Sequence, residues 1–173
     1  MQMNTQSGIE ISFGEDLVIV EELDVYDIAH ALSNICRFNG HCREFYSVAQ
    51  HSVLVSYHCE NKLEGLMHDA PEAYLGDVIA PLKRVLGDVY ARHEASLAQA
   101  IQVHFGLEDW DHLPDVMEAD QAVLAAEVRD LMPPQCIEWV PIRGVEPIRR
   151  QIIPLPPLRA REAFLKRFGQ LGG

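Results

Sequence analysis

Two histidines and two aspartates stand where the pattern of apolar residues predicts buried helix faces: His51, His68, Asp69 and Asp120. A carboxylate on such a face is strongly unfavourable unless it is paired with a cation or bound to a metal. Imidazole nitrogens and carboxylate oxygens together form a mixed ligand set that suits Mn, Co, Fe, Ni or Zn. The four residues therefore predict a site for one divalent transition metal.

Each of these residues also has a purely structural explanation. His51 alone would ordinarily be a core histidine bonded to a backbone carbonyl, and Asp120 alone could pair with Arg129 or Arg150. Adjacent His-Asp pairs also arise by chance. The conjunction on three predicted helices, in the order His, His-Asp, Asp, indicates a metal site more strongly than any single member does.

Two further groups are weaker candidates for metal binding. Cys36, His41 and Cys42 lie close together, but no second ligand pair matches them, so ordinary packed or loop residues explain them better. His93 and His104 share one stripe of a predicted helix and could offer ligands to a second metal. Core packing near the helix ends is the better explanation for both histidines.

Apolar residues at helical spacing predict the elements that would position these side chains. The predicted helices span about 25–36, 47–58, 62–69, 88–105, 115–131 and 159–168. Asp24 is the expected N-cap of the first helix, and Ser47 with Gln50 predicts a capping box at the second. Pro71 requires that the chain kink there or that a new helix begin. Glu127 lies on the same apolar stripe as Asp120.

The fold class predicted from these elements is mainly α, with a short N-terminal β element over 8–20. A chain of 173 residues, 48% of them hydrophobic, fits a single domain, 1–173, with its helical core at about 25–131. The C-terminal extension 133–173 begins with a proline-rich stretch. Because that stretch is rich in apolar residues, we expect it to wrap the core.

A formal net charge of −12 argues against a surface for duplex nucleic acid, which would carry a basic stripe. No apolar run approaches the roughly 18 residues of a membrane helix, and no secretion signal precedes the four cysteines. We therefore expect a cytoplasmic protein with a small-molecule partner, and the sequence leaves a homo-oligomer open. An acidic protein that handles an anionic substrate needs local cations or a metal.

The order His51, His68-Asp69, Asp120 resembles the HD-domain superfamily of metal-dependent phosphohydrolases. The stretches SVAQHS and GLMHDAPEAYLGDVIAPLK, together with EAD ending at Asp120, look most like its branch of bacterial and phage 5′-deoxynucleotidases. The resemblance covers roughly 25–131. It implies an all-helical bundle in which these four residues hold one catalytic metal.

The resemblance also implies roles for residues beside the ligands. Glu72 would position or protonate around the attacking water, and Asp77 would contact the substrate or a water near the phosphate. Arg37-Phe38 resembles an Arg-aromatic pair in which arginine grips the phosphate and the aromatic ring packs on the deoxyribose. Lys83 could be a second phosphate contact. A solvated carboxylate, a turn and a solvated lysine are the ordinary alternatives for Glu72, Asp77 and Lys83.

The expected reaction is hydrolysis of a deoxynucleoside 5′-monophosphate to nucleoside and phosphate by metal-bound water. An alternative on the same metal core is a deoxynucleoside triphosphate triphosphohydrolase, for example a dATPase. A third alternative is a non-catalytic helical module that binds metal. Phe38 stands where tryptophan is frequent in the resembling family, and its spacing to His51 is one residue short, which leaves the substrate open.

Overall fold

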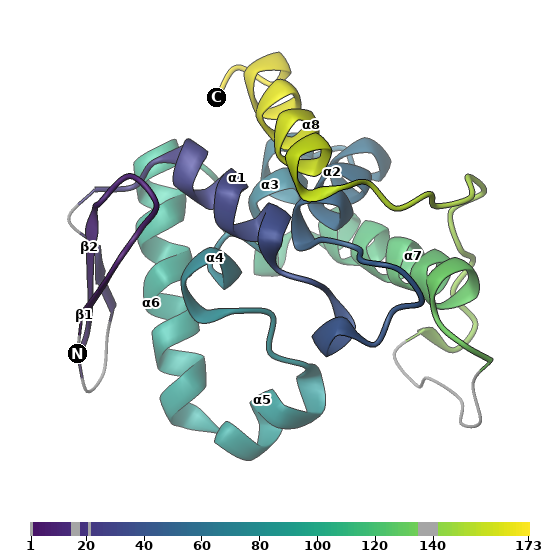
Figure 1. The fold of residues 1–173 in the computed structure, drawn as a ribbon, viewed down its shortest axis with the longest axis horizontal. Coiled ribbons are helices and arrows are strands. Elements are labelled where there is room, and N and C mark those ends of the chain that lie inside the picture. Colours follow the sequence, from purple (N-terminus) through teal and green to yellow (C-terminus); the bar gives the residue numbers. More distant parts are fainter. Residues whose placement is uncertain (1, 15–17, 21, 135–141) are drawn as a thin grey trace.

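The computed structural model describes residues 2–14, 18–20, 22–134 and 142–173. Its fold is mainly α, as the sequence predicts (Figure 1). The α-helices are α1 Val25–Asn34, α2 Val48–His58, α3 Lys62–Met67, α4 Glu72–Leu75, α5 Ala80–Leu86, α6 Asp88–Phe105, α7 Pro114–Leu131 and α8 Pro157–Gln170. Two short 3-10 helices are η1 Phe38–Gly40 and η2 Trp110–His112. Among the described helices, none combines the length and the apolar character that crossing a lipid bilayer requires.

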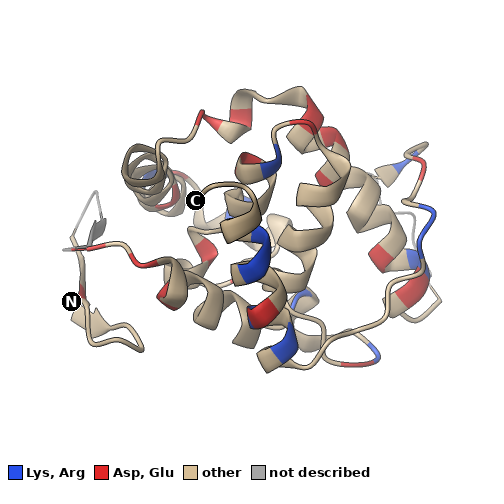
Figure 2. Cartoon of the chain, turned by 90° about the horizontal axis from the view of Figure 1, so that it is seen from above, with Lys and Arg blue, Asp and Glu red and all other residues tan. Residues whose placement is uncertain are grey.

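Helix α2 lies at the centre of the bundle, in contact with α1, α3, α7 and α8 (Figure 1). The apolar stripes that predicted the helices form this core, because Ile28, Val55, Leu66 and Phe164 are all fully buried. Helix α8 lies across α1 and α2, and four basic residues gather on it while acidic residues are spread over most of the other helices (Figure 2). Burial of α2 on so many sides places its polar residues deep inside the fold.

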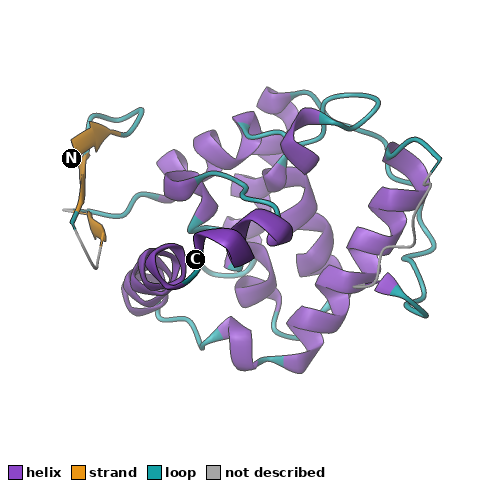
Figure 3. Cartoon of the chain, turned by 90° about the horizontal axis from the view of Figure 1, so that it is seen from below, coloured by secondary structure: helices purple, strands orange, loops and turns teal. Residues whose placement is uncertain are grey.

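The N-terminal strands form a small antiparallel sheet at one edge of the molecule (Figure 3). The strands are β1 Gln2–Asn4, β2 Glu10–Phe13 and β3 Val18–Val20, in the order β1-β2-β3. Pairing of β2 with β3 confirms the β element predicted over 8–20, whereas β1 was not predicted. Strand β3 contacts α6, and the buried Ile11 of β2 ties the sheet to the core.

Helix caps follow the sequence at two side chains and depart from it at a third. Asp24 accepts a hydrogen bond from the Tyr26 amide at 2.8 Å and caps α1 as predicted. Ser47 caps α2 by accepting from the Gln50 amide at 3.2 Å. The reciprocal half of the capping box is wrong, because the Gln50 side chain donates to the Ile153 carbonyl at 2.8 Å and accepts from the Leu155 amide at 2.7 Å.

The C-terminal extension wraps the core wherever the structure describes it. Its backbone amides find partners on α7 as well as on Gln50: Ile148 donates to the Ala122 carbonyl at 3.2 Å, and Ile152 donates to Asp130 at 2.9 Å. Satisfying these backbone groups is what holds an irregular segment against a helical surface. Residues 135–141, in the middle of the predicted wrap, lie outside the described residues.

The segment after α3 bends where the sequence requires a break. Helix α3 ends at Met67, and Pro71 precedes the short helix α4, so the proline restarts a helix instead of interrupting one. Helix α5 was not predicted. It ends at Gly87, whose φ of 65° separates it from α6. The short turn between α3 and α4 carries His68 and Asp69.

A glycine sets the spacing between α2 and α3. A Cβ atom on Gly65 would collide with the Cys59 sulfur and would lie 3.5 Å from the Ser56 Cα atom. A larger residue at position 65 would therefore require the Cys59 thiol to shift, because the glycine leaves no room for a Cβ atom beside it. This contact brings the end of α3 toward the N-terminal half of α2.

Candidate metal centre

Three of the predicted ligands converge in space. His51, His68 and Asp69 each offer one ligand atom, and these atoms all lie within 4.8 Å of one another. The Nε2 atoms of the two histidines are 3.4 Å apart, and Asp69 oxygens lie 3.5 Å from His51 Nε2 and 3.4 Å from His68 Nε2. Two atoms bound tetrahedrally at about 2.1 Å from one ion are themselves about 3.4 Å apart. The group therefore has the spacing of a metal site.

The two histidines are oriented by bonds to their other ring nitrogen. His68 Nδ1 lies 2.9 Å from the Gly65 carbonyl, which can only accept, so Nδ1 carries the proton and Nε2 faces the ligand group. His51 is fully buried in the first turn of α2, and its Nδ1 lies 2.7 Å from a carboxylate oxygen of Glu127. The predicted alternative, a bond from His51 to a backbone carbonyl, is wrong.

Asp120 of α7 lies beside this group and not within it. Its Oδ1 is 3.1 Å from His51 Nε2, and 39% of its side chain is exposed. Burial acts to raise the pKa of Asp120, but the hydrogen bond and charge of His51, together with the charges of His68 and Arg37, outweigh it and hold the pKa below its usual range. The alternative pairing with Arg129 is wrong, because Arg129 pairs with Asp130 at 2.7 Å. Asp120 stays the predicted fourth ligand.

Glu127 contacts the ligand group, but the sequence showed it only as a carboxylate on an apolar helix stripe and predicted no role for it. It lies two helical turns after Asp120 on α7 and has no exposed surface. Besides its contact to His51, its other oxygen lies 3.3 Å from Arg37. A carboxylate on an otherwise apolar stripe is the signal that could have identified it, because such a group needs a buried partner.

Arg37 lies between the ligand group and Glu127. Its guanidinium is 3.3 Å from Asp69 Oδ2 and 3.3 Å from Glu127 Oε2, with only 12% of the side chain exposed. Burial acts to lower the pKa of Arg37, but Glu127 and Asp69 raise it above its ordinary value, so the charge is retained. Its buried Nε has no hydrogen-bond partner among the described residues.

Phe38 lies next to the same guanidinium, with its ring centroid 5.6 Å from the Arg37 carbon Cζ. Its φ of 56° and the φ of 51° at Asn39 fall in the left-handed region, which a bulky side chain such as phenylalanine rarely adopts. Backbone strain of this kind concentrates where a fold holds functional side chains in place.

Glu72 stands at the end of a cavity beside the ligand group. It is 6% exposed, and its Oε2 has no hydrogen-bond partner within the described part of the chain. Burial, Asp69 and Asp77 all raise the pKa of Glu72 well above its usual value. Asp77 is half-buried, and burial raises its pKa while Arg37 opposes the shift. A raised pKa lets such a carboxyl exchange protons near neutral pH.

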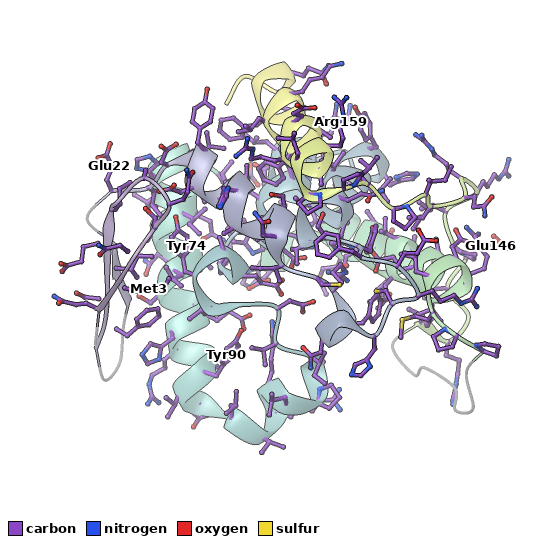
Figure 4. All side chains as sticks on the ribbon, in the orientation of Figure 1. Met3, Glu22, Tyr74, Tyr90, Glu146 and Arg159 are labelled. Carbon is purple, nitrogen blue, oxygen red and sulfur yellow. The ribbon has the colours of Figure 1, made fainter. Side chains whose placement is uncertain are left out.

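Lys83 of α5 also reaches this cavity but is already paired. Its Nζ lies 2.6 Å from Glu94 Oε1 and 3.9 Å from Glu72 Oε1. The Tyr90 ring of α6, labelled in Figure 4, lies beside it with a centroid distance of 5.6 Å. Burial acts to lower the pKa of Lys83, but Glu94 outweighs it and raises the pKa above its ordinary value.

The cavity has a volume of about 320 Å³, within the range of small-molecule sites. Two of the metal-ligand candidates, His68 and Asp69, line the cavity together with Glu72 and Lys83. Residues of α6 and η2 complete the lining: Ala91, Ala95, Ala98 and Trp110 are apolar, and Glu94 and Asp111 are acidic. A molecule with a polar end and a flat apolar part would match this mixed lining.

Negative charge dominates the ligand group. Burial and Arg37 both act to lower the pKa of His51, but Glu127 and Asp120 outweigh them and raise it to about 10. The surrounding carboxylates therefore stabilise positive charge at His51. Stabilisation of positive charge at this point is what binding of a divalent cation requires.

Comparison with known proteins places the chain in a family. No family model matches it. It is 43% identical over 162 residues to the uncharacterized protein YfdR of Escherichia coli (strain K12), a match that covers 92% of the chain and 90% of YfdR. The chain belongs to the YfdR family. An uncharacterized protein of Rhodobacter capsulatus is 38% identical over 97 residues, which is half of each protein.

The weaker metal candidates do not form a site in the described part of this YfdR-family chain. His93 bonds to the Val89 carbonyl at 2.7 Å and to the Gly14 carbonyl at 3.0 Å, and His104 is exposed beside Phe105. The predicted core packing is wrong for His104, which is exposed, and neither histidine belongs to a metal-ligand group among the described residues. The thiols of Cys36 and Cys42 are free, and the described residues place neither in a metal-ligand group.

Proposed function

We propose that this YfdR-family protein is a metal-dependent phosphohydrolase of the HD-domain type that acts on a small nucleotide. The leading substrate is a deoxynucleoside 5′-monophosphate. One observation carries the proposal: of three residues whose ligand atoms have metal spacing, His68 and Asp69 line a cavity that is also lined by the buried Glu72. A purely structural metal site would need neither the cavity nor this acid.

His51, His68 and Asp69 would hold the metal, with Asp120 as the fourth ligand. Two nitrogens and two oxygens suit Mn, Co, Fe, Ni or Zn. A divalent ion bound there supplies Lewis-acid chemistry, since it lowers the pKa of a water and polarises a phosphoryl oxygen. Its charge would also offset the local excess of carboxylates and so let an acidic protein bind an anion.

Glu72 would act as the general acid or base. Glu72 lines the cavity, its buried Oε2 has no hydrogen-bond partner among the described residues, and its raised pKa suits proton transfer near neutral pH. Arg37 does not line the cavity, so its guanidinium, 3.3 Å from Asp69, would act on the phosphate through its charge. Asp77 would orient a water or the substrate near that phosphate.

The distribution of cations favours a monophosphate over a triphosphate. Arg37 is already paired with Asp69 and Glu127, and Lys83 is paired with Glu94. A triphosphate carries more negative charge than a monophosphate and would need additional unpaired cations in the site. Arg37 and Lys83 do not provide them, because both are already in ion pairs. The alanines and Trp110 that line the cavity would face the flat base of the nucleotide.

The test is product analysis of the purified protein with Mn²⁺, Co²⁺ or Zn²⁺ and a panel of deoxynucleoside mono- and triphosphates. We expect orthophosphate from the monophosphates. Release of intact triphosphate from deoxynucleoside triphosphates would instead assign the triphosphohydrolase reaction. No product with any metal, from a protein that binds the metals, would leave the non-catalytic module as the function.

Filling the cavity should weaken substrate binding without disturbing the metal. Ala95 projects from α6 into the cavity, so Ala95→Leu would place an isobutyl group where the base is expected. We expect KM to rise by about tenfold or more while metal affinity stays unchanged. Gln99→Leu, at an exposed position of the same helix outside the cavity lining, is the matched control. Equal KM values for the two variants would place the substrate elsewhere.

A further inference from the structure

Glu127 contacts His51 of the candidate metal centre at Nδ1, the ring nitrogen that does not face the other ligand atoms. On α7 it lies seven residues after Asp120, so it faces the same side of the helix, and it is fully buried. Its two oxygens have different partners: Oε1 lies 2.7 Å from His51 Nδ1, and Oε2 lies 3.3 Å from Arg37 Nη2. It is neither a lining residue of the cavity nor a member of the three-residue ligand group, so its contact to the group runs through the His51 ring and not through a substrate in the cavity.

The contact to His51 decides which ring nitrogen can bind a metal. A carboxylate can only accept, so Nδ1 of His51 carries a proton that points at Glu127. His51 Nε2 then faces His68, Asp69 and Asp120, at 3.4, 3.5 and 3.1 Å respectively. Without an acceptor behind Nδ1, the imidazole would be free to place its proton on Nε2, the tautomer that cannot bind metal through that atom.

The contact to Arg37 explains why this carboxylate stays charged and in place. An isolated buried carboxylate would protonate or withdraw from the core. Arg37 neutralises it and at the same time reaches Asp69 Oδ2 at 3.3 Å. A continuous chain of polar contacts therefore runs from Asp69 through Arg37 and Glu127 to His51, and it closes around the ligand atoms.

We propose that Glu127 is the positioning residue of this metal centre, which holds His51 in the tautomer that offers Nε2 to the metal. The proposal rests on metal binding at His51, His68 and Asp69, which is part of the proposed function, but it does not require turnover. Glu127 binds and orients the side chain of His51. Its loss should therefore lower metal affinity directly and should reduce catalysis only as a consequence of the weaker metal binding.

The test is a titration of the Glu127→Gln variant with Co²⁺. Calorimetry measures the affinity, and the visible absorption spectrum reports the coordination of the bound ion. We expect Co²⁺ affinity to fall by about 10- to 100-fold, with an altered spectrum, because glutamine loses the charge that pairs with Arg37 and can turn either its oxygen or its NH₂ group toward His51 Nδ1, so that it no longer fixes one tautomer. Glu118→Gln removes the same charge from an exposed position of α7 and should match the wild type in both measurements.

Two results would overturn the proposal. A folded Glu127→Gln variant with wild-type Co²⁺ affinity and spectrum would show that the contact is structural only. Nitrogen-15 NMR of the Zn²⁺-loaded wild type gives a second test that needs no variant: we expect a proton on His51 Nδ1 and metal on Nε2, and the reverse assignment contradicts the proposal. If wild type binds metal but hydrolyses nothing, the proposed function fails while the role of Glu127 stands.

Discussion

Replacing Asp69 with Asn should abolish both metal binding and phosphate release. Asp69 lies 3.4 to 3.5 Å from the Nε2 atoms of both histidines and pairs with Arg37 at 3.3 Å. Asparagine preserves the shape but removes the charge that a divalent cation requires. We expect kcat/KM to fall on the order of 10³-fold or more, measured as orthophosphate release, with metal affinity followed by calorimetry.

Asp88→Asn is the matched control for this change, because Asp88 is an exposed aspartate at the start of α6. It should leave metal affinity and turnover unchanged. If Asp69→Asn only lowers the melting temperature while turnover persists, the residue is structural and the ligand set proposed here is wrong.

Replacing Glu72 with Gln should separate catalysis from metal binding. Glu72 is buried, one of its oxygens is unpartnered within the described residues, and its pKa is raised by burial and by Asp69. Glutamine has nearly the same shape but cannot transfer a proton. We therefore expect kcat to fall by about 10² to 10⁴-fold, while metal affinity changes only a few-fold.

The pH profile gives the second measurement for this variant. Because the pKa of Glu72 is raised, its carboxyl keeps a proton to higher pH than an ordinary glutamate. If Glu72 is the general acid, wild-type kcat should decline as pH rises through that raised pKa, and Glu72→Gln should lack this limb. A variant that loses metal together with turnover would instead place Glu72 among the ligands, and one with wild-type kcat would remove it from the chemistry.

The ligand group could be predicted from sequence because its information is local. Helical periodicity places His51 on the buried face of α2, and the turn required by Pro71 follows directly after His68-Asp69. Each inference needs only a few neighbouring residues. The same reasoning correctly placed the long helices, whose apolar stripes are continuous.

Other features depend on partners far away in the sequence and could not be predicted in this way. Gln50 was expected to cap its own helix, but it binds the backbone near Leu155, about one hundred residues later. Arg37 was expected beside the metal, yet its pairing with Glu127 depends on how α7 packs against the loop after α1. Helix α5 is short and largely exposed, so it lacks the apolar stripe on which periodicity relies.

In the proposed metal centre, the close approach of α2 and α3 would make position 65 a determinant of ion size. The Gly65 carbonyl accepts a hydrogen bond from His68 Nδ1, and a side chain at this position would collide with the Cys59 sulfur. A residue too large for the Cys59 thiol to make room would move the end of α3, and with it His68 and Asp69, away from His51. The ligand atoms would then surround a wider space, better matched to an ion of larger radius. Selectivity among metals could therefore change during evolution, or by design, through a residue that never touches the ion.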